Sequence, residues 1–194
     1  MARRSEHSQA EIKQMVLEAA EDIVRENGYS ALKVRKIAAD IGYTVGSIYM
    51  VFANMNDLNM HIKARTWQKL YQYLQTQLTQ PATPATMKNI ALAYLDFSVD
   101  NEGLWRMLFE HQLALGEPVP DWYLQESQRV FGLMHAPIRQ LDHTHSDNEI
   151  QLAAQVLMKS VQGIAMQLLM QKQSLEYIKM AKSEIVVSTH AKLI

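Results

Sequence analysis

Cysteine is absent from the 194 residues, which excludes disulfide bonds, thiolate metal ligands and cysteine nucleophiles. Glycine (7) and proline (5) are scarce, while leucine, alanine, methionine, glutamine and glutamate are plentiful, so the composition favours helices over a β-sandwich or barrel. No apolar run approaches the roughly 18 to 20 residues of a membrane span, and Met1–Ala10 lacks an apolar signal segment. We therefore expect an all-α protein that is cytoplasmic and has no membrane partner.

Neither sign of charge dominates the chain, whose formal net charge is −1. The charge is nevertheless uneven, because residues 1–70 contain ten Lys or Arg against eight Asp or Glu, while the remainder contains nine against twelve. This small N-terminal excess of positive charge permits binding to nucleic acid, although ordinary scatter explains it equally well.

The spacing of the apolar residues predicts about nine helices. The first begins with a capping box at Ser8–Glu11 and ends at Gly28, and a second capping box at Ser146–Glu149 precedes a long helix. Two prolines mark Pro81–Thr86 as a linker, and the second of them suits the first turn of a new helix. The other expected elements are helices at 33–41, from 44 onward, at 54–80, 87–98, 104–111, 122–141 (kinked or ended by Pro137), 150–170 and 175–190, with a loop at 116–121.

Two of these helices, at 33–41 and from Thr44 onward, are short and are separated by a turn at Gly42, which is the spacing of a helix-turn-helix. Glycine permits a sharp turn, and the Thr44 hydroxyl is a good N-cap for the second helix. The small Gly46 would let that helix approach DNA closely. On spacing alone, an ordinary helical hairpin in a bundle explains the pattern more simply.

The same region contains four segments in register between Gly28 and Leu58: Gly28–Leu32, Val34–Ala38, Gly42–Phe52 and Asn56–Leu58. Together they resemble the DNA-binding signature of the TetR family of bacterial regulators. The resemblance implies a dimeric repressor with its recognition helix at Thr44–Tyr49 and a C-terminal domain that binds a small molecule. It implies three parts, which are a three-helix DNA-binding domain at 1–53, a linker helix at 54–80 that transmits the signal, and a helical-bundle domain for ligand binding and dimerisation at 81–194.

Carried over residue by residue, the resemblance assigns contacts with DNA to Thr44, Ser47 and Tyr49. Arg35 lies where the preceding helix would point at the major groove, and a guanidinium group there can donate two hydrogen bonds to guanine. A solvated surface arginine is the alternative. The expected DNA-binding residues are Lys33, Arg35, Lys36, Thr44, Val45, Gly46, Ser47, Tyr49 and Met50.

The chain departs from the family pattern at several contact positions. Val45 stands where members often have lysine, Met50 and Val51 replace tyrosine and histidine, and Met55 replaces the lysine that commonly begins the fourth helix. Each lost cationic contact should lower the salt dependence of DNA binding by about one unit. The candidate substitutes are Lys33, Lys36, Lys13 and the pair Arg3 and Arg4, while the methionine and valine suit thymine methyl groups.

Residues 91–111 resemble, more loosely, one subgroup of TetR-type C-terminal domains, in which a helix, a short turn and an aromatic helix form the wall of a ligand cavity. Methionine and aromatic side chains conform to irregular apolar ligands, and a plain hydrophobic core is the alternative role for each of them. The candidate binding residues for an unknown small-molecule effector are Tyr94, Trp105, Phe109, Trp122, Phe131, Met134, Met158 and Met166.

A homodimer interface is expected on the helices around 124–139 and 150–170, which present small and apolar positions suited to a two-fold, four-helix contact. The resemblance also places the family's interface in this region. The expected interface residues are Ala153, Leu157, Ile164 and Leu168.

Several histidines raise the question of a metal site, because imidazole and carboxylate groups suit zinc or iron. The groups concerned are His111, His135, His143, His145, Asp142 and Asp147. The segment 142–147 is first of all a polar loop between helices, so we expect no metal and no cofactor. A metal-dependent hydrolase is one alternative function, but no nucleophile motif, metal motif or Gly-rich phosphate loop supports it. We expect a non-enzymatic DNA-binding repressor released by a ligand, with a DNA-binding protein that has no effector as the other alternative.

Overall fold

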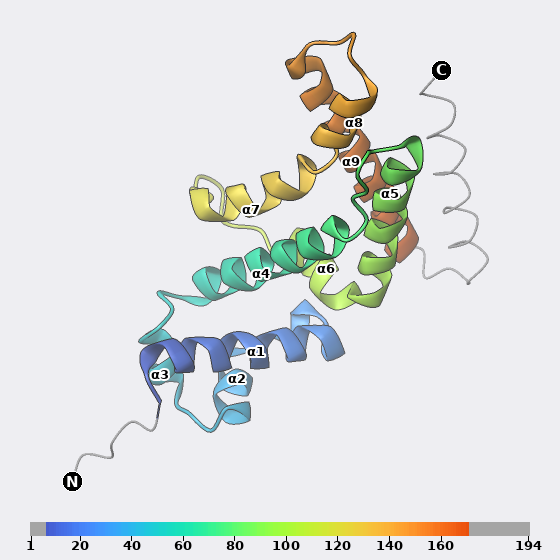
Figure 1. The fold of residues 1–194 in the computed structure, drawn as a ribbon. Coiled ribbons are helices and arrows are strands. Elements are labelled where there is room, and N and C mark those ends of the chain that lie inside the picture. Colours follow the sequence, from blue (N-terminus) through green and yellow to red (C-terminus); the bar gives the residue numbers. More distant parts are fainter. Residues whose placement is uncertain (1–6, 171–194) are drawn as a thin grey trace. The chain divides into compact units, whose positions relative to one another are not determined.

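The computed structural model describes residues 7–170, which form nine α-helices and one short 3-10 helix and contain no β-strand. The all-α prediction is confirmed (Figure 1). The helix expected at 175–190 lies outside the described residues. In chain order the elements are α1 (Gln9–Asn27), η1 (Tyr29–Ala31), α2 (Val34–Asp40), α3 (Val45–Tyr49), α4 (Met55–Gln75), α5 (Pro84–Asp100), α6 (Glu102–Glu110), α7 (Asp121–Phe131), α8 (His135–Leu141) and α9 (Asp147–Met170).

The chain packs into two compact units, and both are assembled from separate stretches of sequence. The first unit comprises Met1–Thr66 together with Gly103–Tyr123, and the second comprises Trp67–Glu102 together with Leu124–Ile194. The boundary falls inside α4, whose first half belongs to the first unit and whose second half belongs to the second.

In the first unit, α1 forms the support on which η1, α2 and α3 pack (Figure 1). Its predicted capping box is confirmed, since the Ser8 amide donates to the Glu11 carboxylate over 2.7 Å and the Glu11 amide donates to the Ser8 hydroxyl over 3.3 Å. These hydrogen bonds hold the pKa of the Glu11 carboxyl below its usual value. The apolar face of α1 is buried with side chains from α2, α3, the start of α4 and α6: Val16, Ala20, Ile23, Val24, Ile37, Ile48, Phe52, Leu58, Ile62, Leu104 and Met107.

The start of α6 approaches α1 very closely at Gly103. A Cβ atom added at this glycine would lie 2.2 Å from the carbonyl oxygen of Val24. Only a residue without a side chain allows this contact, and the contact carries Leu104 and Met107 into the core beside α1. The sequence analysis did not single out Gly103.

The linker after α4 begins earlier than the sequence predicts, because α4 ends at Gln75 rather than near Gln80. Three turns with hydrogen bonds to the third preceding residue follow, the last of them from the Leu78 amide to the Gln75 carbonyl over 3.1 Å. At the other end of the linker, Pro84 lies in the first turn of α5, the position that suits this proline, and the helix therefore begins three residues before the predicted Met87.

The single helix predicted at 122–141 is wrong, because the structure divides it into α7 and α8 with a break at residues 132–134. Gly132 follows the last residue of α7 and has a low helix propensity. Pro137 has no amide hydrogen to donate to a preceding turn, and the new helix that begins at His135 accommodates it in its first turn.

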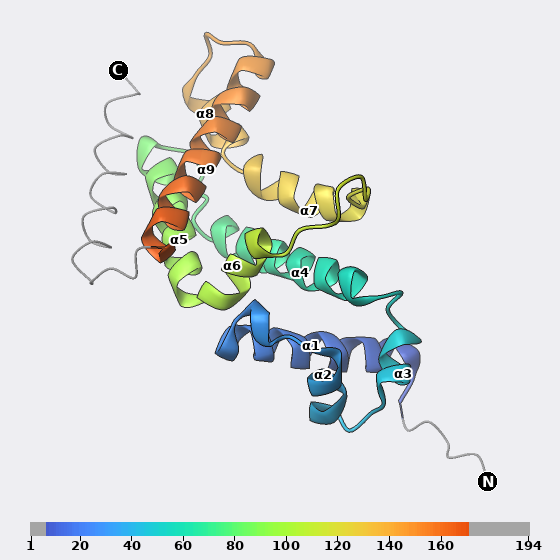
Figure 2. The same ribbon diagram turned by 180° about the vertical axis from the view of Figure 1, so that it is seen from behind.

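In the second unit, α5, α8 and α9 pack against one another (Figure 2). The capping box predicted for α9 is confirmed, with the Glu149 carboxylate accepting from the Ser146 amide over 2.8 Å. One face of α9 is buried through residues spaced three or four apart: Ile150, Ala154, Met158, Val161, Ala165 and Leu168.

By length and composition alone, α9 is the one helix among residues 7–170 that is long and apolar enough to cross a membrane, contrary to the expectation that no segment approaches that length. A third of its most apolar window is buried against the rest of the chain. The core helix of a globular protein meets the same criterion of length and composition, and α9 packs on α5 and α8.

Candidate nucleic-acid interface

The helix-turn-helix predicted around Gly42 is present. Gly42 has a φ of +72°, a conformation that side chains rarely adopt, so a glycine is needed for the turn between α2 and α3. The Tyr43 amide then donates to the Ala38 carbonyl over 2.9 Å, which fixes the turn against α2. Thr44 is the N-cap of α3, and its hydroxyl accepts from the Ser47 amide over 3.1 Å.

The recognition helix is held by one buried side chain and presents most of its other residues outward. Ile48 is fully buried against α1, whereas Tyr49 is 43% exposed and Met50 at its C-cap is 70% exposed. The remaining predicted contact residues of this helix are exposed at Thr44 and Gly46 and half-buried at Val45 and Ser47. The outward surface therefore offers hydroxyl groups, a thioether and no charge.

Positive charge near α3 comes from the residues at the start of α2. Lys33, the N-cap of α2, and Arg35 are both exposed, and neither forms an ion pair with any residue in the described range. The Lys33 side chain makes no capping hydrogen bond to α2. Both cations are therefore available to a ligand with negative charge.

Two other lysines that the sequence offered as phosphate contacts are engaged within the protein. The Lys36 ammonium lies 3.2 Å from the Asp40 carboxylate. The Lys13 ammonium lies 3.2 Å from the His61 ring nitrogen and 5.2 Å from the centroid of the Phe52 ring. Both are less available to phosphate than Lys33 and Arg35.

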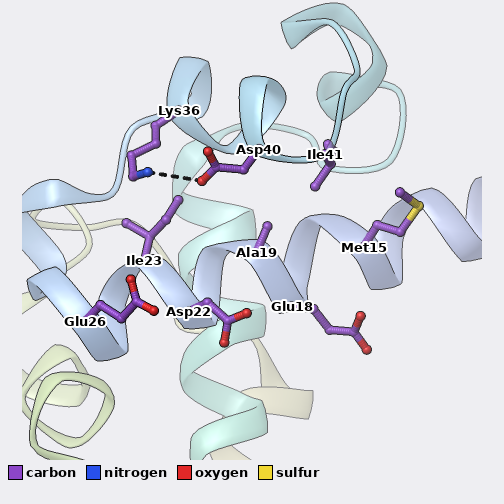
Figure 3. Close-up of a pocket in the computed structure, with 9 residues that line it drawn as sticks. All are labelled: Met15, Glu18, Ala19, Asp22, Ile23, Glu26, Lys36, Asp40 and Ile41. Carbon is purple, nitrogen blue, oxygen red and sulfur yellow. Dashed lines mark hydrogen bonds and ion pairs between the residues drawn. The ribbon is translucent and has the colours of Figure 1, made fainter.

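Lys36 belongs to a groove of about 440 Å³ between α1 and α2, which we call the acidic groove (Figure 3). Four carboxylates and one ammonium group line it, together with apolar side chains: Glu18, Asp22, Glu26, Asp40, Lys36, Met15, Ala19, Ile23 and Ile41. Its charge repels phosphate, so the acidic groove is unsuited to the DNA backbone.

A buried polar cluster joins α4 to the end of α6 within the first unit. The Lys63 ammonium donates to the carbonyl oxygen of His111 over 2.9 Å and lies 5.3 Å from the centroid of the Tyr123 ring. Lys63 is 6% exposed, and burial lowers its pKa to about 8. The His111 ring lies 3.2 Å from the Asn56 amide oxygen, and burial, followed by the charge of Lys63, lowers the pKa of His111. His111 is thus a buried structural residue that fastens the end of α6 to α4.

The residues predicted to bind a small molecule are divided between the two units. Trp105, Phe109 and Trp122 belong to the first unit, and Tyr94, Phe131, Met134, Met158 and Met166 belong to the second. Four of them, Tyr94, Trp105, Met134 and Met158, are fully buried, as the alternative of a plain core requires. Trp122 is 39% exposed and stacks on His61 with 4.6 Å between the ring centroids.

The residues predicted for dimerisation lie on α9. Ala153 is exposed, Leu157 and Ile164 are half-buried, and Leu168 is only 5% exposed because it packs within its own chain. Large apolar side chains that the sequence analysis did not name lie on the exposed face: Leu152 is 62% exposed, Val156 is 54% exposed and Met170 is 72% exposed. Leu152 and Val156 are four residues apart, and this helical spacing is the sequence pattern that could have indicated a second apolar face of α9.

Two of the histidines considered for a metal site each form a pair with a single carboxylate. The His145 ring lies 2.6 Å from Asp142, and the His135 ring lies 3.2 Å from Asp147. Hydrogen bonds from Thr144 and His145 lower the pKa of Asp142 well below its usual range. Among the described residues no group of three or more histidine, aspartate or glutamate side chains is placed to hold a metal ion.

Comparison with known proteins identifies the N-terminal segment. Residues 16–59 match the family described as "Bacterial regulatory proteins, tetR family". The fatty acid metabolism regulator protein of Bacillus subtilis (strain 168) is 28% identical over 68 residues, which are 35% of this chain and 35% of that protein. The match therefore spans about a third of the relative's length.

Solved structures of such regulators have a similar fold over most of the chain. A tetR-family transcriptional regulator from Streptomyces coelicolor has a TM-score of 0.72 and 15% identity, over 95% of this chain and 81% of that one. The transcriptional regulator FadR from Bacillus subtilis, in complex with stearoyl-CoA, has a TM-score of 0.64 and 17% identity, over 90% and 96%. The N-terminal helix-turn-helix therefore matches the tetR family of bacterial regulatory proteins, and the fold of the chain is similar to that of solved tetR-family transcriptional regulators.

Proposed function

We propose that the protein is a repressor that binds a palindromic operator as a homodimer and is released from it by a small apolar or aromatic ligand. The observation that carries the proposal is a helix-turn-helix whose α3 has an uncharged, outward-facing surface and whose α2 begins with two exposed cations, Lys33 and Arg35, that have no ion-pair partner among residues 7–170. Such a surface meets the base edges while the flanking cations meet phosphate or guanine.

The hydroxyl groups of Thr44, Ser47 and Tyr49 suit phosphate oxygens, and the Met50 thioether suits the methyl group of thymine. Because α3 itself has no cation, we expect a shallow salt dependence, with each phosphate contact through Lys33 or Arg35 contributing about one unit of slope. The guanidinium of Arg35 is the group best able to read guanine directly.

Dimerisation is proposed through the exposed face of α9. Leu152 and Val156 lie there with Ala153 and Gly163, which are small and also exposed. A two-fold contact of this face with its copy would remove these apolar side chains from water. A dimer presents two copies of α3, so each half of a palindromic operator would meet one of them.

The effector is proposed to bind in the C-terminal domain, at 81–194, with the helix at 54–80 transmitting the signal to the DNA-binding domain at 1–53. Support for an apolar ligand comes from the fatty acid metabolism regulator protein, which 68 residues of this chain resemble, and from the stearoyl-CoA bound to FadR. The aromatic and methionine residues named from the sequence are the candidate contacts.

Selection of operators from random duplexes by the purified chain tests this function. We expect a palindrome whose half-sites lie about one helical turn apart, and loss of its binding when Arg35→Gln or Tyr49→Phe is introduced. Lys88→Gln, which removes a cation from α5, outside the helix-turn-helix and the proposed dimer face, is the matched control. Enrichment of no sequence would contradict the proposal. An enriched operator that no acyl-CoA or aromatic acid releases, with no ligand raising the melting temperature, would indicate a DNA-binding protein without an effector.

A further inference from the structure

A second groove of the first unit lies between the η1–α2 segment and the start of α4 and has a volume of about 590 Å³. We call it the α2–α4 groove. We propose that it binds a small amphipathic organic anion, one with an acidic head and an apolar body, and that this anion competes with DNA. The volume lies within the range of small-molecule sites.

The charge of the residues that line the α2–α4 groove favours an anionic ligand. Lys33 and Arg35 both line the α2–α4 groove, no carboxylate does, and neither cation has an ion-pair partner among residues 7–170. Two acidic groups lie outside the lining: the Glu117 carboxylate accepts from the Asn56 amide over 3.2 Å and from the Ala114 amide over 3.3 Å, and the charge of Glu110 acts on Tyr29. The acidic groove on α1 and α2 has the opposite charge, so the two grooves of one unit differ in the ligand each suits.

The wall of the α2–α4 groove is apolar, and its deepest polar group is not satisfied. Leu32, Val34 and Met55 supply apolar surface for a ring or a short chain. Asn59 lines the groove at 3% exposure, and its side-chain oxygen has no hydrogen-bond partner, while its amide donates to the Tyr29 hydroxyl over a long 3.4 Å. A buried acceptor without a donor is costly, so a ligand with a hydroxyl or amide hydrogen at this end gains from reaching it.

Competition with DNA follows if Lys33 and Arg35 bind DNA, and this step rests on the proposed function. The same cation cannot bind the acidic head of the ligand and a phosphate group of the duplex at the same time. The anion would therefore lower DNA affinity directly at the helix-turn-helix, independently of any effector bound by the C-terminal domain at 81–194.

The test uses the full chain labelled with 15N and three probes: 8-anilino-1-naphthalenesulfonate, decanoate and octyl phosphate. We expect saturable binding with shifts of backbone amides in 29–35 and 55–59. Comparison of the affinities for decanoate and octyl phosphate shows whether the groove prefers a carboxylate or a phosphate head group. Lys33→Gln with Arg35→Gln should weaken binding by about tenfold or more, because charge-assisted hydrogen bonds to the acidic head are lost.

Lys36→Gln, which removes a cation from the acidic groove, is the matched control and should leave probe binding unchanged. Met55→Trp, which fills the α2–α4 groove, should also weaken it. Shifts confined to other segments, or binding indifferent to the Lys33 and Arg35 changes, would overturn the proposal. Probe binding at the groove with no affinity for any duplex would refute the proposed function alone, whereas duplex binding that none of the probes reduces would refute the competition.

Discussion

Replacing the buried Lys63 by methionine should stabilise the protein at neutral pH. Lys63 is 6% exposed, forms no ion pair with a described residue and has one hydrogen bond, to the His111 carbonyl. Burial lowers its pKa from 10.5 to about 8. Each pKa unit corresponds to about 1.4 kcal/mol, so the ammonium group opposes folding by about 3 kcal/mol at pH 7. Methionine has a similar length, avoids this penalty and forfeits a hydrogen bond of about 1 kcal/mol. The net gain at pH 7 is about 2 kcal/mol.

The sign of the pH dependence follows from the same shift. Between about pH 8 and pH 10.5 the unfolded chain keeps the Lys63 proton while the folded chain has lost it, so the stability of the unaltered protein rises with pH relative to Lys63→Met. By pH 10 the penalty has fallen to about 1 kcal/mol, and the two proteins should be about equally stable.

Urea denaturation of both proteins, followed by circular dichroism at pH 7, 8, 9 and 10, measures this difference. Taking the difference at each pH cancels the titration of every other group. Lys159→Met, on the exposed face of α9, is the control, and its difference from the unaltered protein should not vary in this way. A Lys63→Met protein that is less stable at pH 7, or whose difference from the unaltered protein is independent of pH, would refute the reasoning.

Three further predictions concern packing, capping and assembly. Gly103→Ala should destabilise the protein by about 2 kcal/mol or more, because its Cβ would overlap the Val24 carbonyl oxygen. In Gly163→Ala the added Cβ meets no atom within 4 Å, so this variant should not be destabilised. Equal urea midpoints for the two variants would contradict the contact between Gly103 and Val24. Thr44→Ala removes the N-cap of α3 and should cost about 1 kcal/mol, with Thr44→Ser restoring it; an unchanged urea midpoint for Thr44→Ala would count against the cap. Val156→Glu places a charge on the exposed face of α9 and should yield a monomer in sedimentation equilibrium, and an unchanged dimer would place the interface elsewhere.

Features set by short-range chemistry were predictable from the sequence. The Ser8 and Ser146 capping boxes need only residues three apart, and both are present. The turn at Gly42 and the cap at Thr44 are equally local. The proposal that α3 reads DNA rests on this local pattern together with the family resemblance.

Features set by contacts between distant segments were not predictable. Gly103 is needed only because α6 meets α1, some eighty residues earlier in the chain, and neither segment contains a sign of the other. The break after Gly132 was missed because Pro137 was assigned the role of breaker, although a proline is tolerated in the first turn of a new helix.

The partners of charged residues were likewise not predictable from the sequence. Lys36 and Arg35 are neighbours in sequence, but α2 directs Lys36 toward Asp40 in the acidic groove and Arg35 toward the α2–α4 groove. The fold decides which cations lie beside a carboxylate and which are free to bind DNA. The positions of the cations along the sequence therefore do not show which of them are available to phosphate. The buried Lys63 is a further case, since its low pKa arises entirely from its surroundings.

The central claim is that α3 and the cations beside it read operator DNA, and competition binding across a salt series tests it most directly. A fluorescent duplex carrying the selected operator is titrated with the protein and with Arg35→Gln, each in the presence of excess random duplex. The account predicts that the unaltered protein prefers the operator by about a thousandfold or more, and that Arg35→Gln loses part of this preference together with about one unit of salt slope. Equal affinity for operator and random duplex, or a substitution at Arg35 without effect on either quantity, would contradict it.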